Sequence, residues 1–176
     1  MASALIDIAL LPGEYFVGDA RHRIRTLLGS CVAIALWQPQ RRVGALSHFL
    51  LPRCAAAHAG LDGHYGEEAL TLMLRLLHQR GIGAHQCQAK VFGGGIMFPD
   101  LEHDPDCIGR QNVDAALNLL HGHGIPVVSQ SVLGLGHRQI VFHVRSGDIW
   151  VRRGPQPDPA ASVIIGNIGN DSGRMP

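Results

Sequence analysis

The pattern of apolar and polar residues along the chain predicts many short strands. The apolar runs are short, rich in branched side chains, and separated by glycine, proline or polar links. Such runs are typical of strands in packed sheets. The expected strands cover residues 5–11, 15–17, 23–28, 32–37, 43–51, 88–92, 126–133, 139–145, 148–152 and 163–165.

Two segments instead repeat their apolar residues at helical spacing. The first covers 66–79, with two glutamates in its first turn and Gly81 placed to end it, and the second covers about 110–121. The inward-facing residues are Leu70, Met73, Leu74 and Leu77 in the first and Val113, Ala116, Leu117 and Leu120 in the second. Many short strands with two helices predict an α/β fold. We expect packed, largely antiparallel or mixed β-sheets with a β-sandwich-like core and the two main helices outside.

One predicted hairpin carries the candidate chemistry. Two apolar runs are joined by the polar link 38–42, in which Pro39 suits a type I turn. If the turn is centred between Pro39 and Gln40, Cys31 pairs with His48, with Cβ atoms about 4.5–5.5 Å apart. An adjacent imidazole lowers a thiol's pKa or takes its proton, and either makes the cysteine a nucleophile. The alternative is a small buried thiol and a packed histidine.

Length and composition predict a single globular domain that binds neither nucleic acid nor membrane. The 176 residues, 46% hydrophobic and 16% charged, suffice for one domain with a real core. We expect a single domain over 1–165 and a flexible tail rich in glycine, asparagine and serine over 166–176. A net charge of +1 gives no basic stripe for nucleic acid, and no apolar run is long enough to cross a membrane. Because the N-terminus lacks a basic secretory start, we expect a cytoplasmic protein.

The four cysteines, Cys31, Cys54, Cys87 and Cys107, form no Cys-x-x-Cys pair. We expect free thiols in a reducing compartment. Histidines lie near three of them, but at differing spacings, whereas structural zinc sites usually have two tight ligand pairs. The sequence therefore predicts no metal and no other cofactor. Of the four, Cys31 alone is expected to have a histidine partner.

A glycine run follows the strand expected at 88–92. Such a run can cradle phosphate, but the Lys-Ser/Thr that a phosphate loop needs is absent. Glycines also let a backbone approach its neighbour closely, which fits a wall of an active-site groove. Asn112 lies near the start of the second helix, where N–H groups are free. The candidate substrate or partner groove is formed by Phe92, Gly93, Gly94 and Asn112.

Five motifs occur together and in a fixed order. They are TLLGSCVA at 26–33, SHFLLP at 47–52, KVFGGG at 90–95, IGRQN at 108–112 and GLGHRQIVF at 134–142. In these motifs and their order the chain resembles the CheD family, the chemoreceptor glutamine deamidases of bacterial chemotaxis. The resemblance implies a CheD-like cysteine hydrolase fold. It also implies that Cys31 is the nucleophile, His48 its base and Thr26 a supporting polar group.

The resemblance implies deamidation of specific glutamines in chemotaxis receptors, with possible hydrolysis of glutamyl methyl esters as well. In such chemistry, backbone N–H groups of the Gly29-Ser30-Cys31 turn can hold the oxyanion. Two alternatives stay open from the residues. One is another cysteine hydrolase, such as a peptidase or a transglutaminase-like enzyme, because it shares the Cys/His chemistry. The other is an adaptor that binds receptors or the phosphatase CheC, both of which the resemblance implies as partners.

Overall fold

The computed structural model describes residues 4–155. In this part of the chain there are two α-helices and nine strands. The helices are α1 (Gly66–Gln79) and α2 (Ile108–Gly122). The strands are β1 (Ile6–Ala9), β2 (Tyr15–Gly18), β3 (His22–Leu28), β4 (Val32–Gln38), β5 (Val43–Ser47), β6 (Gln88–Gly93), β7 (Val127–Val132), β8 (Arg138–His143) and β9 (Asp148–Arg153).

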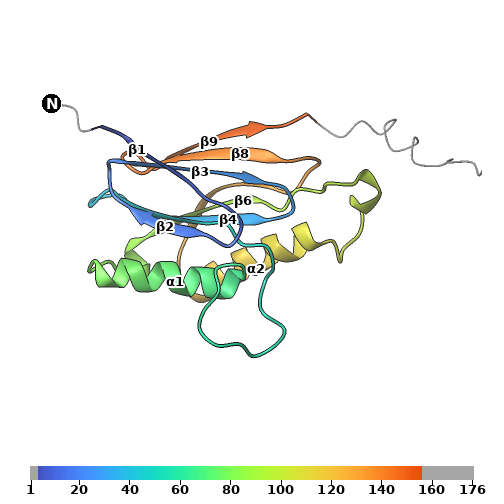
Figure 1. Cartoon of the computed structure of the whole chain (residues 1–176), viewed down its shortest axis with the longest axis horizontal. Helices are drawn as coiled ribbons and strands as arrows, with labels where there is room; N and C mark the ends of the chain where they lie inside the picture. The colour runs from blue at the N-terminus through green and yellow to red at the C-terminus, as the bar shows by residue number, and fades with distance from the viewer. Residues whose placement is uncertain (1–3, 156–176) are drawn as a thin grey trace, which may run out of the picture.

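These elements form three layers (Figure 1). A four-stranded sheet, in the order β1-β3-β8-β9, packs on a five-stranded sheet, in the order β2-β5-β4-β6-β7. The two helices cover the outer face of the five-stranded sheet. Each sheet is antiparallel except for one parallel pair, β1 with β3 and β6 with β7. The predicted α/β fold of packed, largely antiparallel sheets with two outer helices is confirmed.

Most predicted elements lie where the sequence placed them, and α1 has the predicted bounds. The strand expected at 43–51 ends at Ser47, because beyond it only Phe49 still bridges to β4. The structure also has two short 3-10 helices that the sequence did not predict, Ala84–Gln86 and Pro99–Leu101. The strand expected at 163–165 and the tail expected at 166–176 lie outside the described residues.

Strand β4 lies inside the five-stranded sheet and is buried on both faces, which explains its continuous apolar sequence. Val32 and Ile34 pack toward the helices, whereas Ala33 and Ala35 pack toward the other sheet. Cys31 directly precedes the strand and belongs to the second set. Its side chain therefore faces the layer between the two sheets.

The β4–β5 hairpin differs in register from the sequence prediction. Val32 bridges to Phe49, and the rest of the hairpin follows the same register. The centre of the turn therefore lies one residue later than expected, and the predicted direct pairing of Cys31 with His48 is wrong. This change moves the partner by two positions. Because side chains alternate with a period of two, Cys31 and His48 keep the same face as diagonal neighbours.

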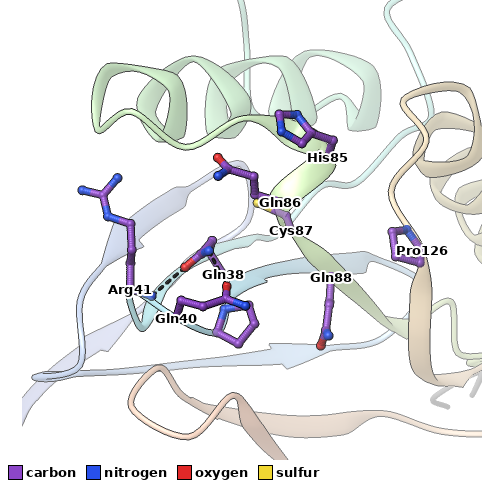
Figure 2. Close-up of a pocket in the computed structure, with 9 residues that line it drawn as sticks. Gln38, Gln40, Arg41, His85, Gln86, Cys87, Gln88 and Pro126 are labelled. Atoms are coloured by element: carbon purple, nitrogen blue, oxygen red, sulfur yellow. Dashed lines mark hydrogen bonds between the residues drawn. The ribbon is translucent and has the colours of Figure 1, made fainter.

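The turn itself explains the register. Gln38, the last residue of β4, accepts a hydrogen bond at Oε1 from the Arg41 backbone N–H at 2.7 Å, and its Nε2 donates to Gln40 at 2.6 Å (Figure 2). Four residues, 39–42, thus separate the strands. A pocket of about 670 Å³ opens beside this turn, also lined by Cys87. It lies at the opposite end of β4 from Cys31, so it is separate from the Cys31 site.

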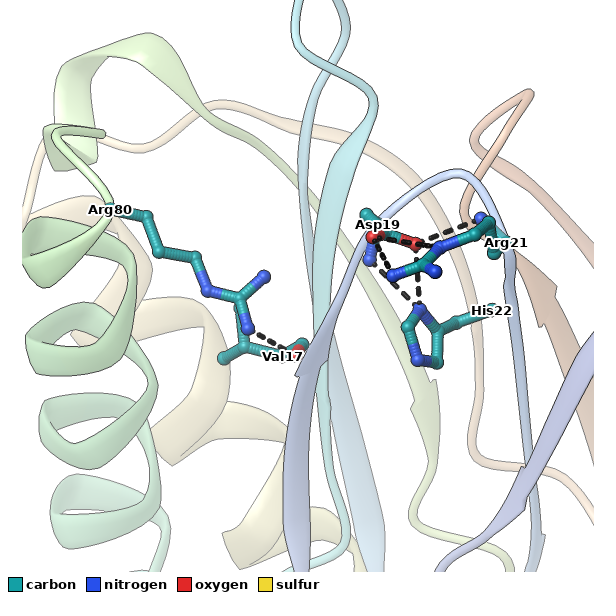
Figure 3. Close-up of polar contacts among 5 residues, drawn as sticks. All are labelled: Val17, Asp19, Arg21, His22 and Arg80. Carbon is teal, nitrogen blue, oxygen red and sulfur yellow. Dashed lines mark hydrogen bonds and ion pairs between the residues drawn. The ribbon is translucent and has the colours of Figure 1, made fainter.

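Polar contacts hold the chain where it leaves β2 (Figure 3). The Asp19 carboxylate accepts hydrogen bonds from the Arg21 guanidinium at 2.9 Å and lies 2.9 Å from His22 Nδ1. The bonds from Arg21 hold the pKa of the Asp19 carboxyl well below its usual range. Arg80, just after α1, donates to the Val17 carbonyl at 3.1 Å. These contacts fix the crossing from β2 to β3 and tie the end of α1 to the sheet.

A buried arginine connects the two sheets at another point. Arg138 begins β8 and is 1% exposed. Its guanidinium donates to the carbonyls of Ser131 and Leu133 at the end of β7. Burial lowers the pKa of Arg138, although a guanidinium stays charged at neutral pH.

Candidate active site

Thr26, Cys31 and His48 come from three segments and face the layer between the sheets. Thr26 lies on β3, where Ile24 and Leu28 on the same face are core residues of that layer. His48 directly follows β5 and is 3% exposed, whereas Cys31 is half-buried. Strand alternation therefore directs a polar group from each sheet into an otherwise apolar layer.

The hydrogen bonds of Thr26 define the state of His48. Thr26 Oγ1 donates to the Leu10 carbonyl at 2.9 Å and lies 2.7 Å from His48 Nδ1. A hydroxyl has one proton and a carbonyl only accepts, so Oγ1 must accept from the Nδ1–H group. The other ring nitrogen, Nε2, is then the unprotonated one. It is buried and has no hydrogen-bond partner within residues 4–155, so it can accept a proton.

Burial acts on both members of the Cys/His pair. It lowers the pKa of His48 to about 4 and raises the pKa of the Cys31 thiol. At neutral pH the imidazole is therefore uncharged and the thiol protonated. Of the two effects expected of an imidazole, lowering the thiol pKa or taking its proton, the second fits this arrangement.

The three backbone carbonyls of the Gly29-Ser30-Cys31 turn each accept a hydrogen bond from a segment later in the chain. Gly95 N–H donates to Gly29 O at 2.8 Å, and Gly94 N–H donates to Cys31 O at 2.8 Å. The Asn112 side chain donates to Ser30 O at 3.1 Å. Within the described chain, the N–H groups of Ser30 and Cys31 donate to no backbone carbonyl. N–H groups that no backbone carbonyl occupies can hold a developing oxyanion.

The four residues predicted to form a groove are all buried. Gly93 has a φ of +108°, and a Cβ there would lie 2.2 Å from the Cys31 carbonyl oxygen. The expected close backbone approach at the glycine run is therefore confirmed, and it supports the turn. Phe92 and Asn112 also lie inside the protein. A contact of these four residues with a substrate or partner stays a prediction.

The surface next to the turn comes from a segment that sequence reasoning missed. A pocket of about 140 Å³ lies beside Ser30 and is otherwise lined by residues 95–98, 101 and 107–109. Met97, Phe98 and Leu101 are exposed at its edge, and Phe98 is 67% exposed. Their signal in the sequence was a group of large apolar residues with neither strand nor helix periodicity. We call these three residues the apolar rim.

Cys54 differs from Cys31 in that its surroundings lower its thiol pKa. A backbone hydrogen bond at Ala56, with Tyr65 and His58 nearby, lowers the pKa of the Cys54 thiol. This thiol lies in the irregular segment between β5 and α1. Burial instead raises the pKa of Cys87 to about 11. Cys54 is therefore a second candidate for reactivity toward simple thiol reagents.

The described part of the chain lacks two features that would point to other functions. No three His, Cys, Asp or Glu side chains are grouped so that they could hold a metal ion. Among residues 4–155, no helix is long and apolar enough to cross a membrane.

Comparison with known proteins places the chain in a family. A family model described as CheD chemotactic sensory transduction matches residues 50–153. The probable chemoreceptor glutamine deamidase CheD 2 of Albidiferax ferrireducens is 53% identical over 171 residues, which cover 96% of this chain and 92% of that protein. An alignment of that extent also includes Cys31 and His48, which precede the part matched by the family model.

A more distant relative has the same name. The probable chemoreceptor glutamine deamidase CheD of Pseudomonas savastanoi pv. phaseolicola is 42% identical over 151 residues, 85% of each chain. Among solved structures, the Bacillus licheniformis hypothetical protein YfiH aligns at 14% identity with a TM-score of 0.44, covering 68% of this chain and 51% of that one. On the family model and the full-length relatives, the chain belongs to the CheD family.

Proposed function

We propose that this protein is a cysteine amidohydrolase that converts glutamine side chains of chemotaxis receptors to glutamate. The observation that carries the proposal is the state of His48, a buried neutral imidazole whose unpaired Nε2 lies in the layer that Cys31 also faces. The names of the relatives, probable chemoreceptor glutamine deamidases, support the choice of substrate.

In the first half of the reaction, Cys31 Sγ attacks the carboxamide carbon of the glutamine. His48 Nε2 takes the thiol proton as the S–C bond forms, and the carbonyl π electrons move to the oxygen. The N–H groups of Ser30 and Cys31 stabilise this oxyanion. The imidazolium then returns the proton to nitrogen, the C–N bond breaks, and ammonia leaves a thioester.

In the second half, water replaces ammonia. His48 Nε2 takes a proton from the water as its oxygen attacks the thioester carbon. Collapse of the second tetrahedral intermediate breaks the S–C bond, and the proton returns to sulfur. Thr26 accepts from Nδ1–H in both the neutral ring and the imidazolium, so Nε2 is the nitrogen that takes and returns the proton. The same steps apply to a glutamyl methyl ester with methanol as leaving group, and that activity stays a prediction.

A receptor helix can approach the site from the side of the apolar rim. The rim and the pocket beside Ser30 adjoin the Gly29-Ser30-Cys31 turn. Exposed apolar side chains around a pocket are typical of protein-binding surfaces. A glutamine on the helix would enter toward the turn while neighbouring apolar side chains contact the rim. A cytoplasmic location and binding to CheC stay predictions.

The test is release of ammonia from a purified receptor cytoplasmic fragment. We expect ammonia with the parent protein, none with Cys31→Ala, and no shortening of the receptor chain on a denaturing gel. Cleavage of the chain would indicate a peptidase. Receptor binding without ammonia would indicate an adaptor.

A further inference from the structure

Asn112 makes two hydrogen bonds that join the segments on either side of the site. It lies in the first turns of α2 and is 0% exposed. Its Nδ2 donates to the Ser30 carbonyl at 3.1 Å and to the Leu50 carbonyl at 2.7 Å. An amide NH₂ group has two hydrogens, so each carbonyl receives one.

The bond to Ser30 sets the direction of a catalytic donor. The carbonyl of Ser30 and the N–H of Cys31 belong to one peptide group, and in a trans peptide they point in opposite directions. An amide that holds this carbonyl therefore aims the Cys31 N–H away from α2. Gly95 acts in the same way one residue earlier, because its N–H holds the Gly29 carbonyl and thereby orients the Ser30 N–H.

The second bond reaches the segment that carries the base. Leu50 lies two residues after His48, where the chain has left regular β-pairing. The Leu50 N–H donates to the His64 carbonyl at 2.9 Å, so its peptide groups are held on both sides. This side chain is thus a second link between the turn of Cys31 and the segment of His48, which the Val32–Phe49 bridge also joins.

The remaining atom of the amide has no partner. Asn112 Oδ1 is buried and has no hydrogen-bond partner within the described chain. A buried polar atom without a partner destabilises a fold. A leucine of similar volume would remove this unpaired oxygen, but it would also leave the Ser30 and Leu50 carbonyls without their donor.

We propose that Asn112 is a positioning residue that orients the Cys31 N–H for the oxyanion. The inference rests on the proposed deamidase chemistry. It predicts that removal of the two donors weakens every step that forms an oxyanion at the turn. The rates of reactions at Cys31 that form no oxyanion should not change.

The experiment compares Asn112→Leu and Asn112→Asp with the parent, all in a Cys54→Ala background so that Cys31 labelling is easy to follow. Asn118→Leu is the matched control, because Asn118 is exposed on the same helix. Removal of a direct oxyanion donor typically costs about 10²–10³-fold in kcat. For an indirect role we expect kcat to fall at least about tenfold, with KM within about threefold.

Two reagents separate positioning from general damage. Iodoacetamide alkylates Cys31 at a saturated carbon and forms no oxyanion, so its rate should stay within about threefold of the parent. A peptide aldehyde in which CHO replaces the glutamine carboxamide forms a hemithioacetal with Cys31. Sγ bonds to the aldehyde carbon, the thiol proton goes to His48 Nε2, and the carbonyl π electrons move to the oxygen, which becomes an oxyanion at the turn. Its affinity, measured by protection of Cys31 from iodoacetamide, should fall at least about tenfold in both Asn112 variants. Asn112→Asp should regain affinity as the pH is lowered, because its protonated carboxyl has one donor.

Parent-like kcat and aldehyde affinity in the Asn112 variants would overturn the proposal. So would equal losses in alkylation, aldehyde affinity and turnover, or failure of both variants to fold, because each would assign the amide to the fold. The aldehyde measurement needs no deamidation. If the parent binds the aldehyde but releases no ammonia from receptors, the proposed function fails while the role of Asn112 can still be measured.

Discussion

Thr26 Oγ1 lies 2.7 Å from His48 Nδ1, and this contact joins the four-stranded sheet to the five-stranded sheet across the buried layer between them. Because the hydroxyl proton is donated to Leu10, the contact also selects the ring tautomer. The site is therefore supported by the packing of two sheets as well as by the hairpin.

Removing the Thr26 hydroxyl should impair turnover without removing the base. Thr26→Val keeps the volume but leaves Nδ1–H without an acceptor, so the imidazole is no longer held in one tautomer and orientation. General acid–base help is typically worth about 10²–10⁴-fold, and we expect a loss of about tenfold or more in kcat. Ammonia release is the measurement. Thr26→Ser retains the hydroxyl and should stay within a few-fold of the parent, whereas parent-like activity of Thr26→Val would contradict this role.

The cysteines should separate by reactivity and by function. At neutral pH, iodoacetamide should label Cys54 faster than Cys31, because the pKa of Cys54 is lowered and that of Cys31 is raised. Cys54→Ala should nevertheless keep turnover within a few-fold of the parent, while Cys31→Ala should fold and be inactive. Peptide mass mapping after timed labelling checks the order. Faster labelling of Cys31, or an inactive but folded Cys54→Ala, would show that this assignment is wrong.

His48 should make stability depend on pH. Burial lowers its pKa from 6.5 to about 4, so between these values the unfolded chain binds a proton at His48 that the folded chain does not. This contribution to stability is present above the unfolded pKa and is lost as the pH falls toward about 4. The free energy of unfolding, measured in urea, should therefore fall more steeply on acidification for the parent than for His48→Gln. Parallel pH curves for the two proteins would contradict a buried neutral imidazole.

Much of the fold followed from local patterns. The bounds of α1 followed from its apolar face, its acidic first turn and Gly81, all of which are local signals. The Cys31/His48 pair was placed on one face even though the register was wrong, because a two-position change preserves side-chain alternation. The turn could not be centred correctly because its closure depends on the Gln38 side chain, which leaves no pattern in the sequence.

Other parts of the site depend on contacts between distant segments. Asn112 was predicted from the sequence as a residue of the candidate groove. Its hydrogen bonds to the Ser30 and Leu50 carbonyls could not be predicted, because they span 82 and 62 residues. The raised pKa of Cys31 likewise results from packing of the two sheets, which no short motif records. The apolar rim was missed because its residues follow no regular periodicity.

The most direct test is the intact mass of a purified receptor cytoplasmic fragment after incubation with the parent protein or with Cys31→Ala. The account predicts that the parent produces the mass increase of replacing an amide NH₂ by OH at one or more glutamines, with the receptor chain otherwise unchanged. Cys31→Ala should leave the receptor mass as it was. An unchanged receptor with the parent, or an equal mass increase with Cys31→Ala, would contradict the account.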